Sequence, residues 1–104
     1  MNIVWTQKAE SDLKEIIEYI SDDSLKNAQT IYNKIQKATM QLKDFPESGV
    51  LPKDQVLKNR GYRMLIVEKY LVFYLYENEV IIISIIHGAQ KYAHLFSKNI
   101  NIGS

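Results

Sequence analysis

The chain has 104 residues, no cysteine and a formal net charge of +1. This length predicts a single domain, and the lack of cysteine excludes disulfides and thiolate metal sites. No run approaches the roughly 18 apolar residues that a membrane span needs, and the first residues lack a secretory pattern. We therefore expect a cytoplasmic protein that does not interact with membranes.

The charge is unevenly distributed along the chain. Residues 1–23 carry two lysines against six carboxylates, a net charge of −4, whereas residues 24–43 carry four lysines and no acid, a net charge of +4. Solvated helix faces account for many patterns of this kind. The alternative is a basic surface that meets nucleic acid or an acidic partner.

The first half of the chain predicts a strand followed by two helices. Asn2 to Trp5 is a short apolar run, and Thr6 suits a helix N-cap because its hydroxyl accepts a free backbone N–H. An apolar stripe at helical spacing then predicts a helix over about residues 7–20. Its members are Ala9, Leu13, Ile16, Ile17 and Ile20.

A second apolar stripe runs from Leu25 to Phe45 and predicts a helix over about residues 24–43, which Pro46 ends. The short joint at residues 21–24 predicts that the two helices form an antiparallel hairpin. Residues 46–60 contain both prolines and are predicted to form a loop of about fifteen residues, a length typical of functional or disordered segments.

The stretch from Gly61 to Gly88 holds three apolar runs with short charged linkers: residues 62–67, 70–76 and 80–86. Runs this rich in Val, Ile, Tyr and Phe predict an antiparallel meander. The predicted fold class is α+β, in the order β-α-α-β-β-β, with the helical hairpin on a small antiparallel sheet. Both faces of the middle strand are apolar, so we expect the hairpin to cover one face and a partner to cover the other.

The arrangement resembles the RelE/ParE superfamily of toxins from type II toxin–antitoxin modules. The resemblance spans nearly all of residues 1–104 as one toxin domain. It rests on AESDLKEI at residues 9–16, GYRML at 61–65, YLVFY at 70–74 and IIHG at 85–88. It implies a bacterial growth-inhibiting toxin of the plasmid-stabilisation type, which a cognate antitoxin neutralises. RelE-like members cleave mRNA in the ribosome, and ParE-like members inhibit DNA gyrase, so fold alone does not choose between them.

If the chain is a metal-independent endoribonuclease, His87 is the candidate proton carrier, because imidazole titrates near neutrality. Arg63, Arg60 and Lys91 are then candidates to hold phosphate, and Tyr92 is a candidate catalytic or base-stacking residue. Each has a structural alternative. A histidine at a strand end is often incidental, and Arg63 alternates with apolar residues as the polar side of an edge strand does.

The resemblance favours the gyrase-directed branch. Superfamily nucleases tend to carry an arginine just before the middle strand's Leu-Val, and Tyr70 precedes Leu71 and Val72 here. The candidate target-binding residues are then Arg60, Arg63, Lys91 and Lys98, with no metal and no cofactor. An acidic antitoxin segment would suit the lysine-rich second helix. An inactive relative that only binds a partner is a further alternative.

Overall fold

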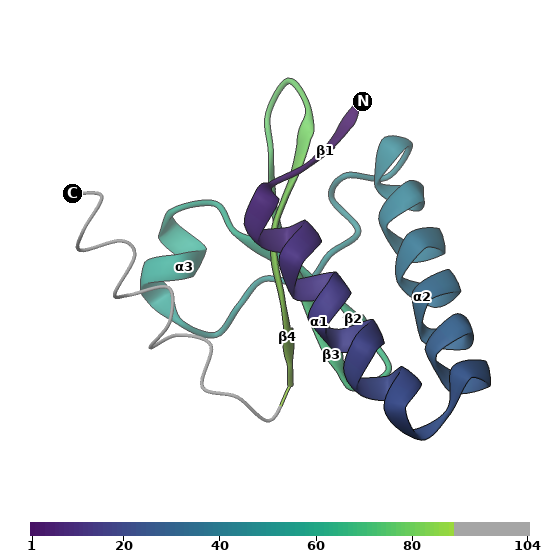
Figure 1. Ribbon diagram of the computed structural model, residues 1–104. Helices are drawn as coiled ribbons and strands as arrows, with labels where there is room; N and C mark the ends of the chain where they lie inside the picture. Colours follow the sequence, from purple (N-terminus) through teal and green to yellow (C-terminus); the bar gives the residue numbers. More distant parts are fainter. Residues whose placement is uncertain (89–104) are drawn as a thin grey trace.

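The computed structural model describes residues 1–88, and Figure 1 shows their arrangement. Two long helices, α1 (Gln7–Asp23) and α2 (Leu25–Met40), form an antiparallel hairpin on one face of a four-stranded sheet. A short 3₁₀ turn, η1 (Gln41–Lys43), extends α2. The helix α3 (Gln55–Asn59) lies away from the hairpin. The predicted order of elements and the α+β class are confirmed.

The two hydroxyl caps explain where the long helices begin. Thr6 Oγ1 accepts a 3.0 Å hydrogen bond from Ala9 N and donates one to Ile83 O, so the cap also fastens the start of α1 to the sheet. Ser24 ends α1, because its N–H donates to Ile20 O, and it begins α2, because its Oγ accepts from Asn27 N. A single residue therefore serves as the joint of the hairpin.

The sheet has the order β1-β4-β3-β2, with β1 (Ile3–Trp5), β2 (Arg63–Val67), β3 (Tyr70–Tyr76) and β4 (Val80–His87). The strands β2, β3 and β4 form the predicted antiparallel meander. The first strand pairs in parallel with the last one, with Ile3 opposite Val80. The sheet is therefore mixed, and the chain between β1 and β4 runs through both long helices and through β2 and β3, not through a tight turn.

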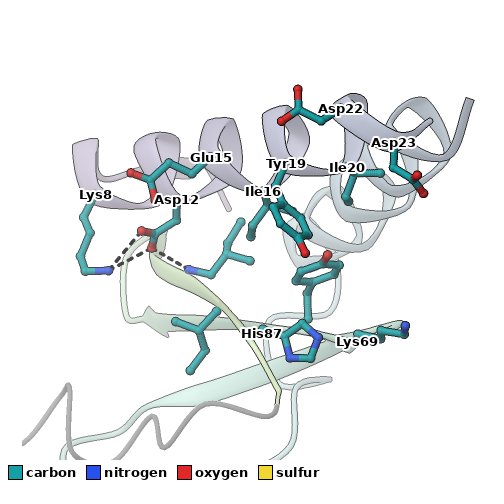
Figure 2. A pocket seen from close by; sticks show the side chains of 13 residues that line it. Lys8, Asp12, Glu15, Ile16, Tyr19, Ile20, Asp22, Asp23, Lys69 and His87 are labelled. Atoms are coloured by element: carbon teal, nitrogen blue, oxygen red, sulfur yellow. Dashed lines mark hydrogen bonds and ion pairs between the residues drawn. The ribbon is translucent and has the colours of Figure 1, made fainter. Parts of the chain in front are cut away.

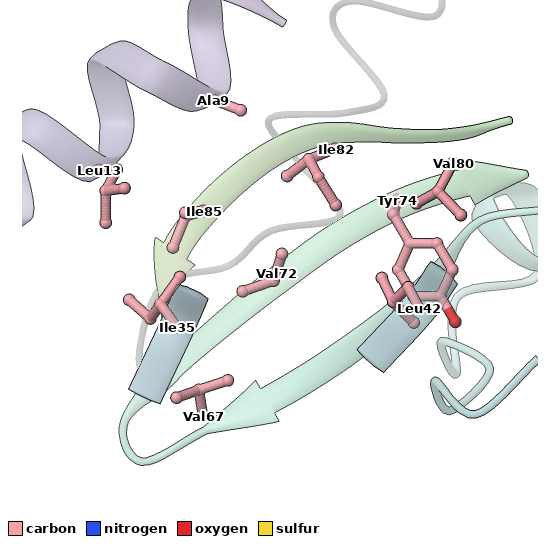
Figure 3. Close-up of a cluster of buried hydrophobic side chains, with 10 residues drawn as sticks. All are labelled: Ala9, Leu13, Ile35, Leu42, Val67, Val72, Tyr74, Val80, Ile82 and Ile85. Carbon is pink, nitrogen blue, oxygen red and sulfur yellow. The ribbon is translucent and has the colours of Figure 1, made fainter. Parts of the chain in front are cut away.

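The main hydrophobic core lies between the helical hairpin and the sheet (Figure 3). Ala9 and Leu13 come from α1, Ile35 comes from α2, and the strands contribute residues such as Val72 and Ile82. The apolar stripes that predicted the helices are thus the stripes that the helices bury. Burial at about 25 cal/mol per Å² of apolar surface makes this layer the main source of stability.

On the opposite face of the sheet, the structure differs from two predictions made from the sequence. Residues 46–60 are not one continuous loop, because Asp54 caps α3 through a hydrogen bond from Leu57 N and Val50 bridges to Met64. Leu57 of α3 joins a second buried cluster with Phe73 on β3. The chain therefore covers much of the face that we expected a partner to cover, and the exposed remainder includes Ile66 at the edge strand, 63% exposed.

Candidate functional site

A groove of about 1090 Å³ lies between α1 and the end of the sheet where β3 begins and β4 ends. Ile16 and Ile20 of α1 and Ile85 and Ile86 of β4 contribute apolar surface to it. Figure 2 shows α1 on one side, with His87 and Lys69 on the other. His87, the candidate proton carrier, therefore lies at the end of β4 and lines this groove.

An Asp12 network fixes the middle of this groove. The Oδ2 atom of Asp12 accepts hydrogen bonds from Ser84 Oγ at 2.7 Å, from Ile85 N at 3.0 Å and from Lys8 Nζ at 3.0 Å. Lys8 Nζ also donates to Ser84 Oγ. Three hydrogen bonds to one oxygen atom hold the Asp12 carboxylate in one orientation. Sequence reasoning missed this network, which joins α1 to β4 across 72 positions of sequence.

His87 and the neighbouring turn form the opposite wall. The His87 ring packs edge-on against Tyr70, with ring centroids 5.6 Å apart, and Gly88 N donates to Lys69 O at 2.7 Å. Glu68 in the β2–β3 turn has a positive φ of 54° and forms an ion pair with Lys34 of α2. The hydrogen bond and positive charge of Lys34 hold the pKa of Glu68 below its usual value.

Arg63 lies at the other end of the sheet and holds a loop. Its Nη1 atom donates to Gly49 O at 2.9 Å and to Glu47 O at 3.2 Å, and its guanidinium carbon lies 5.9 Å from the centre of the Tyr76 ring. Arg63 therefore anchors residues 46–50 through two of their backbone carbonyls. These contacts match the structural alternative for Arg63.

Tyr74 completes this anchor from inside the core. Its buried hydroxyl donates to Pro46 O at 2.7 Å and accepts from Gly49 N at 2.9 Å. Burial raises the pKa of Tyr74, and the hydrogen bond from Gly49 and the charge of Arg63 oppose this. A Cβ atom at Gly49 would lie 2.5 Å from the Tyr74 hydroxyl, so only glycine fits there.

Within residues 1–88, the structure does not bring the candidate ribonuclease residues Arg63 and His87 together. Arg63 pairs with Tyr74, and His87 pairs with Tyr70, four positions away on β3. At about 3.3 Å per residue this separates them by roughly 13 Å along the strand. Arg60 ends α3 and lowers the pKa of nearby Tyr62, which burial raises more strongly. The candidates Lys91, Tyr92 and Lys98 lie outside the described residues.

Within residues 1–88, no group of three His, Asp or Glu side chains is arranged to hold a metal ion. No helix in the same part of the chain is both long and apolar enough to cross a bilayer.

A strand, a helical hairpin and a three-stranded meander, in this order, form the architecture predicted from the resemblance to the RelE/ParE superfamily. A family model described as the ParE toxin of type II toxin-antitoxin system, parDE, matches residues 3–92, and the chain belongs to that family. The solved structure titled "Chromosomal ParDE TA system from P. aeruginosa" is similar to this chain, with a TM-score of 0.68 and 23% identity. The match covers 84% of this chain and 95% of that one, and at this identity the likeness is one of fold. A search of curated proteins finds no match to the chain.

Proposed function

We propose that this ParE-family toxin arrests growth in the bacterial cytoplasm by inhibiting DNA gyrase, and that a cognate antitoxin neutralises it. The observation that carries this proposal is the separation of Arg63 from His87. RNA cleavage without a metal needs a proton carrier and a cation at one phosphate. In the described residues, the arginine expected for that role anchors backbone carbonyls at the far end of β3.

Family membership supports the same target. Within the superfamily, ParE-like members inhibit gyrase and RelE-like members cleave mRNA, and the family model that matches this chain is the ParE one. Binding to gyrase needs a surface and no proton carrier. The basic residues predicted to contribute to that surface are Arg60, Arg63, Lys91 and Lys98.

The test compares two assays on one purified protein. Gyrase supercoiling of relaxed plasmid is measured with increasing toxin, and mRNA cleavage is measured in a reconstituted translation reaction. We expect the wild type and His87→Ala to inhibit supercoiling within about threefold of each other, because general acid–base catalysis, worth about 10²–10⁴-fold, is not used. Lys91→Ala/Lys98→Ala should weaken inhibition, and prior addition of antitoxin should abolish it.

Ribosome-dependent cleavage that His87→Ala abolishes would replace this proposal with the RNA-directed one. Binding of antitoxin without any effect in either assay would identify an inactive relative. Growth arrest on expression, together with induction of the DNA damage response and continued translation, is the expected cellular result.

A further inference from the structure

The groove between α1 and the β3–β4 end combines an apolar floor with charged walls of unequal sign. On the α1 side the carboxylates are Asp12, Glu15, Asp22 and Asp23, together with the ammonium group of Lys8. On the sheet side the charged or titratable groups are Lys69 and His87. Asp12 and Lys8 are occupied with each other and with Ser84. The remaining α1 wall, formed by Glu15, Asp22 and Asp23, is therefore purely acidic.

Two of these carboxylates lie where a negative charge destabilises the helix that carries them. Asp22 and Asp23 occupy the last turn of α1, which contains no basic residue. The C-terminal end of a helix dipole is negative, so anions there are unfavourable and cations are favoured. Within residues 1–88 neither side chain forms an ion pair, and both are exposed. Residues that break a local rule without a compensating contact in the isolated chain are often kept for function.

The same stretch of α1 exposes an aromatic ring beside the floor. Tyr19 lines the groove and is 79% exposed, the largest exposed fraction among the exposed large hydrophobic residues of the described chain. Its neighbours Ile16 and Ile20 also line the groove and are half-buried. An exposed ring between carboxylates suits a lysine or arginine, because the aliphatic stem packs on the ring while the cation meets the acids.

We propose that this groove is the docking site for a cationic segment of the cognate antitoxin. Lysine or arginine side chains of that segment meet Glu15, Asp22 and Asp23, and its apolar side chains cover Ile16 and Ile20. The inference rests on the proposed toxin–antitoxin pairing and adds to it the place and the sign of the contact. An apolar floor beside an exposed ring fits a partner that stays bound, which is the relation of an antitoxin to its toxin.

The proposal also predicts the order of charges along the antitoxin. The lysines of α2 do not line this groove and suit an acidic stretch, whereas the α1 wall suits a basic one. A segment that wraps both elements therefore carries opposite charges along its length.

The experiment measures the Kd of the full-length toxin for purified cognate antitoxin by calorimetry at two salt concentrations. Asp22→Asn/Asp23→Asn should weaken binding about fivefold to twentyfold, because each exposed ion pair contributes about twofold to fivefold. Asp22→Lys/Asp23→Lys should weaken it about 30- to 100-fold at low salt and much less at high salt. The matched control for Asp22→Asn/Asp23→Asn is Glu18→Lys, which also makes the chain more positive by two charges, on an exposed residue of α1 that does not line this groove.

A second readout separates docking from a structural role. Asp22→Asn/Asp23→Asn should raise the Tm of the isolated toxin while it lowers antitoxin affinity, because the variant removes anions from the negative end of the helix. A structural role would lower both quantities. A loss of affinity in a variant whose Tm equals or exceeds that of the wild type cannot be assigned to unfolding.

Three results would overturn the proposal. The first is an antitoxin Kd that the groove variants leave unchanged, and the second is an equal loss in Glu18→Lys. The third is a loss of gyrase inhibition with antitoxin affinity intact, which would assign the groove to the target. Failure of the proposed function shows instead in the wild type, as no antitoxin binding or no inhibition of gyrase.

Discussion

Replacing Tyr74 by phenylalanine removes one oxygen atom and tests the anchor that holds residues 46–50. The Gly49 N–H is buried and loses its acceptor, which costs about 1–2 kcal/mol. The Pro46 carbonyl is half-buried and regains water, so its loss contributes about 0.5 kcal/mol. We therefore expect Tyr74→Phe to lower the free energy of unfolding by about 2 kcal/mol.

The assay is urea unfolding followed by circular dichroism, with a thermal melt beside it. For a domain of this size, 1 kcal/mol shifts Tm by about 4–8 °C, so the melt should move down by about 8–16 °C. The urea m-value should stay constant, because the variant changes a local contact and not the surface exposed on unfolding.

The matched control is Tyr76→Phe, two positions along β3. Tyr76 is half-buried, packs near Arg63 through its ring, and needs no hydroxyl for that contact. Its change should stay within about 0.5 kcal/mol of wild type. A loss in Tyr74→Phe no greater than in this control would refute the reasoning, because it would mean that the Gly49 N–H is satisfied without Tyr74.

Three further predictions concern other contacts. Asp12→Ala should lower the free energy of unfolding by about 2 kcal/mol, because Ser84 and the Ile85 N–H lose their acceptor, and urea unfolding measures it. Glu68→Gly should raise Tm by a few degrees, because relief of a positive φ is worth about 1 kcal/mol and an exposed ion pair about 0.5 kcal/mol; a clear fall in Tm would contradict this. Since burial raises the pKa of Tyr74 above the ordinary 10.0, its contribution to stability is complete below that pH and is lost as the pH rises further. The stability of the wild type should therefore fall more steeply in alkali than that of Tyr74→Phe, and parallel pH profiles would rule this out.

The helical hairpin could be predicted from sequence because its signals are local. The stripe around Leu13 repeats at helical spacing, and the caps Thr6 and Ser24 are the residue types that accept a free backbone N–H. The predicted end of the first helix fell short, because α1 continues to Asp23. Acidic residues are unfavourable near the C-terminus of a helix, so the sequence-based prediction ended this helix before Asp22 and Asp23.

The parallel pairing of β1 and the helix α3 could not be predicted in the same way. A strand of three residues is too short to show a periodic pattern, and its sequence does not indicate which strand it pairs with. In the structure, Ile3 of β1 pairs with Val80 of β4. The five residues of α3 are too few to show a helical period, although Asp54 is a recognisable N-cap residue. The packing of Leu57 against Phe73 depends on the tertiary fold, so it could be recognised only from the structure.

The candidate site was predicted in part. The position of His87 at a strand end follows from the length of the last apolar run, and the structure confirms it. The function of His87 stays a prediction. The contacts of Arg63 could not be read from sequence, because its acceptors are backbone carbonyls that any residue type offers. Gly49 was the available signal, since a buried glycine indicates close approach of another group, here the Tyr74 ring.

The pairing of the first strand with the last has a consequence for how the toxin is made. Ile3 leaves the ribosome early but must wait for Val80, 77 positions later, before β1 can join the sheet. Closing so long a loop is slow compared with forming the α1–α2 hairpin, so a nascent chain holds its helices before it holds its sheet. A message cut short anywhere before β4 therefore yields a product that lacks Ile85 and Ile86, the part of the groove floor that the sheet contributes, and in which β1 has no strand to pair with.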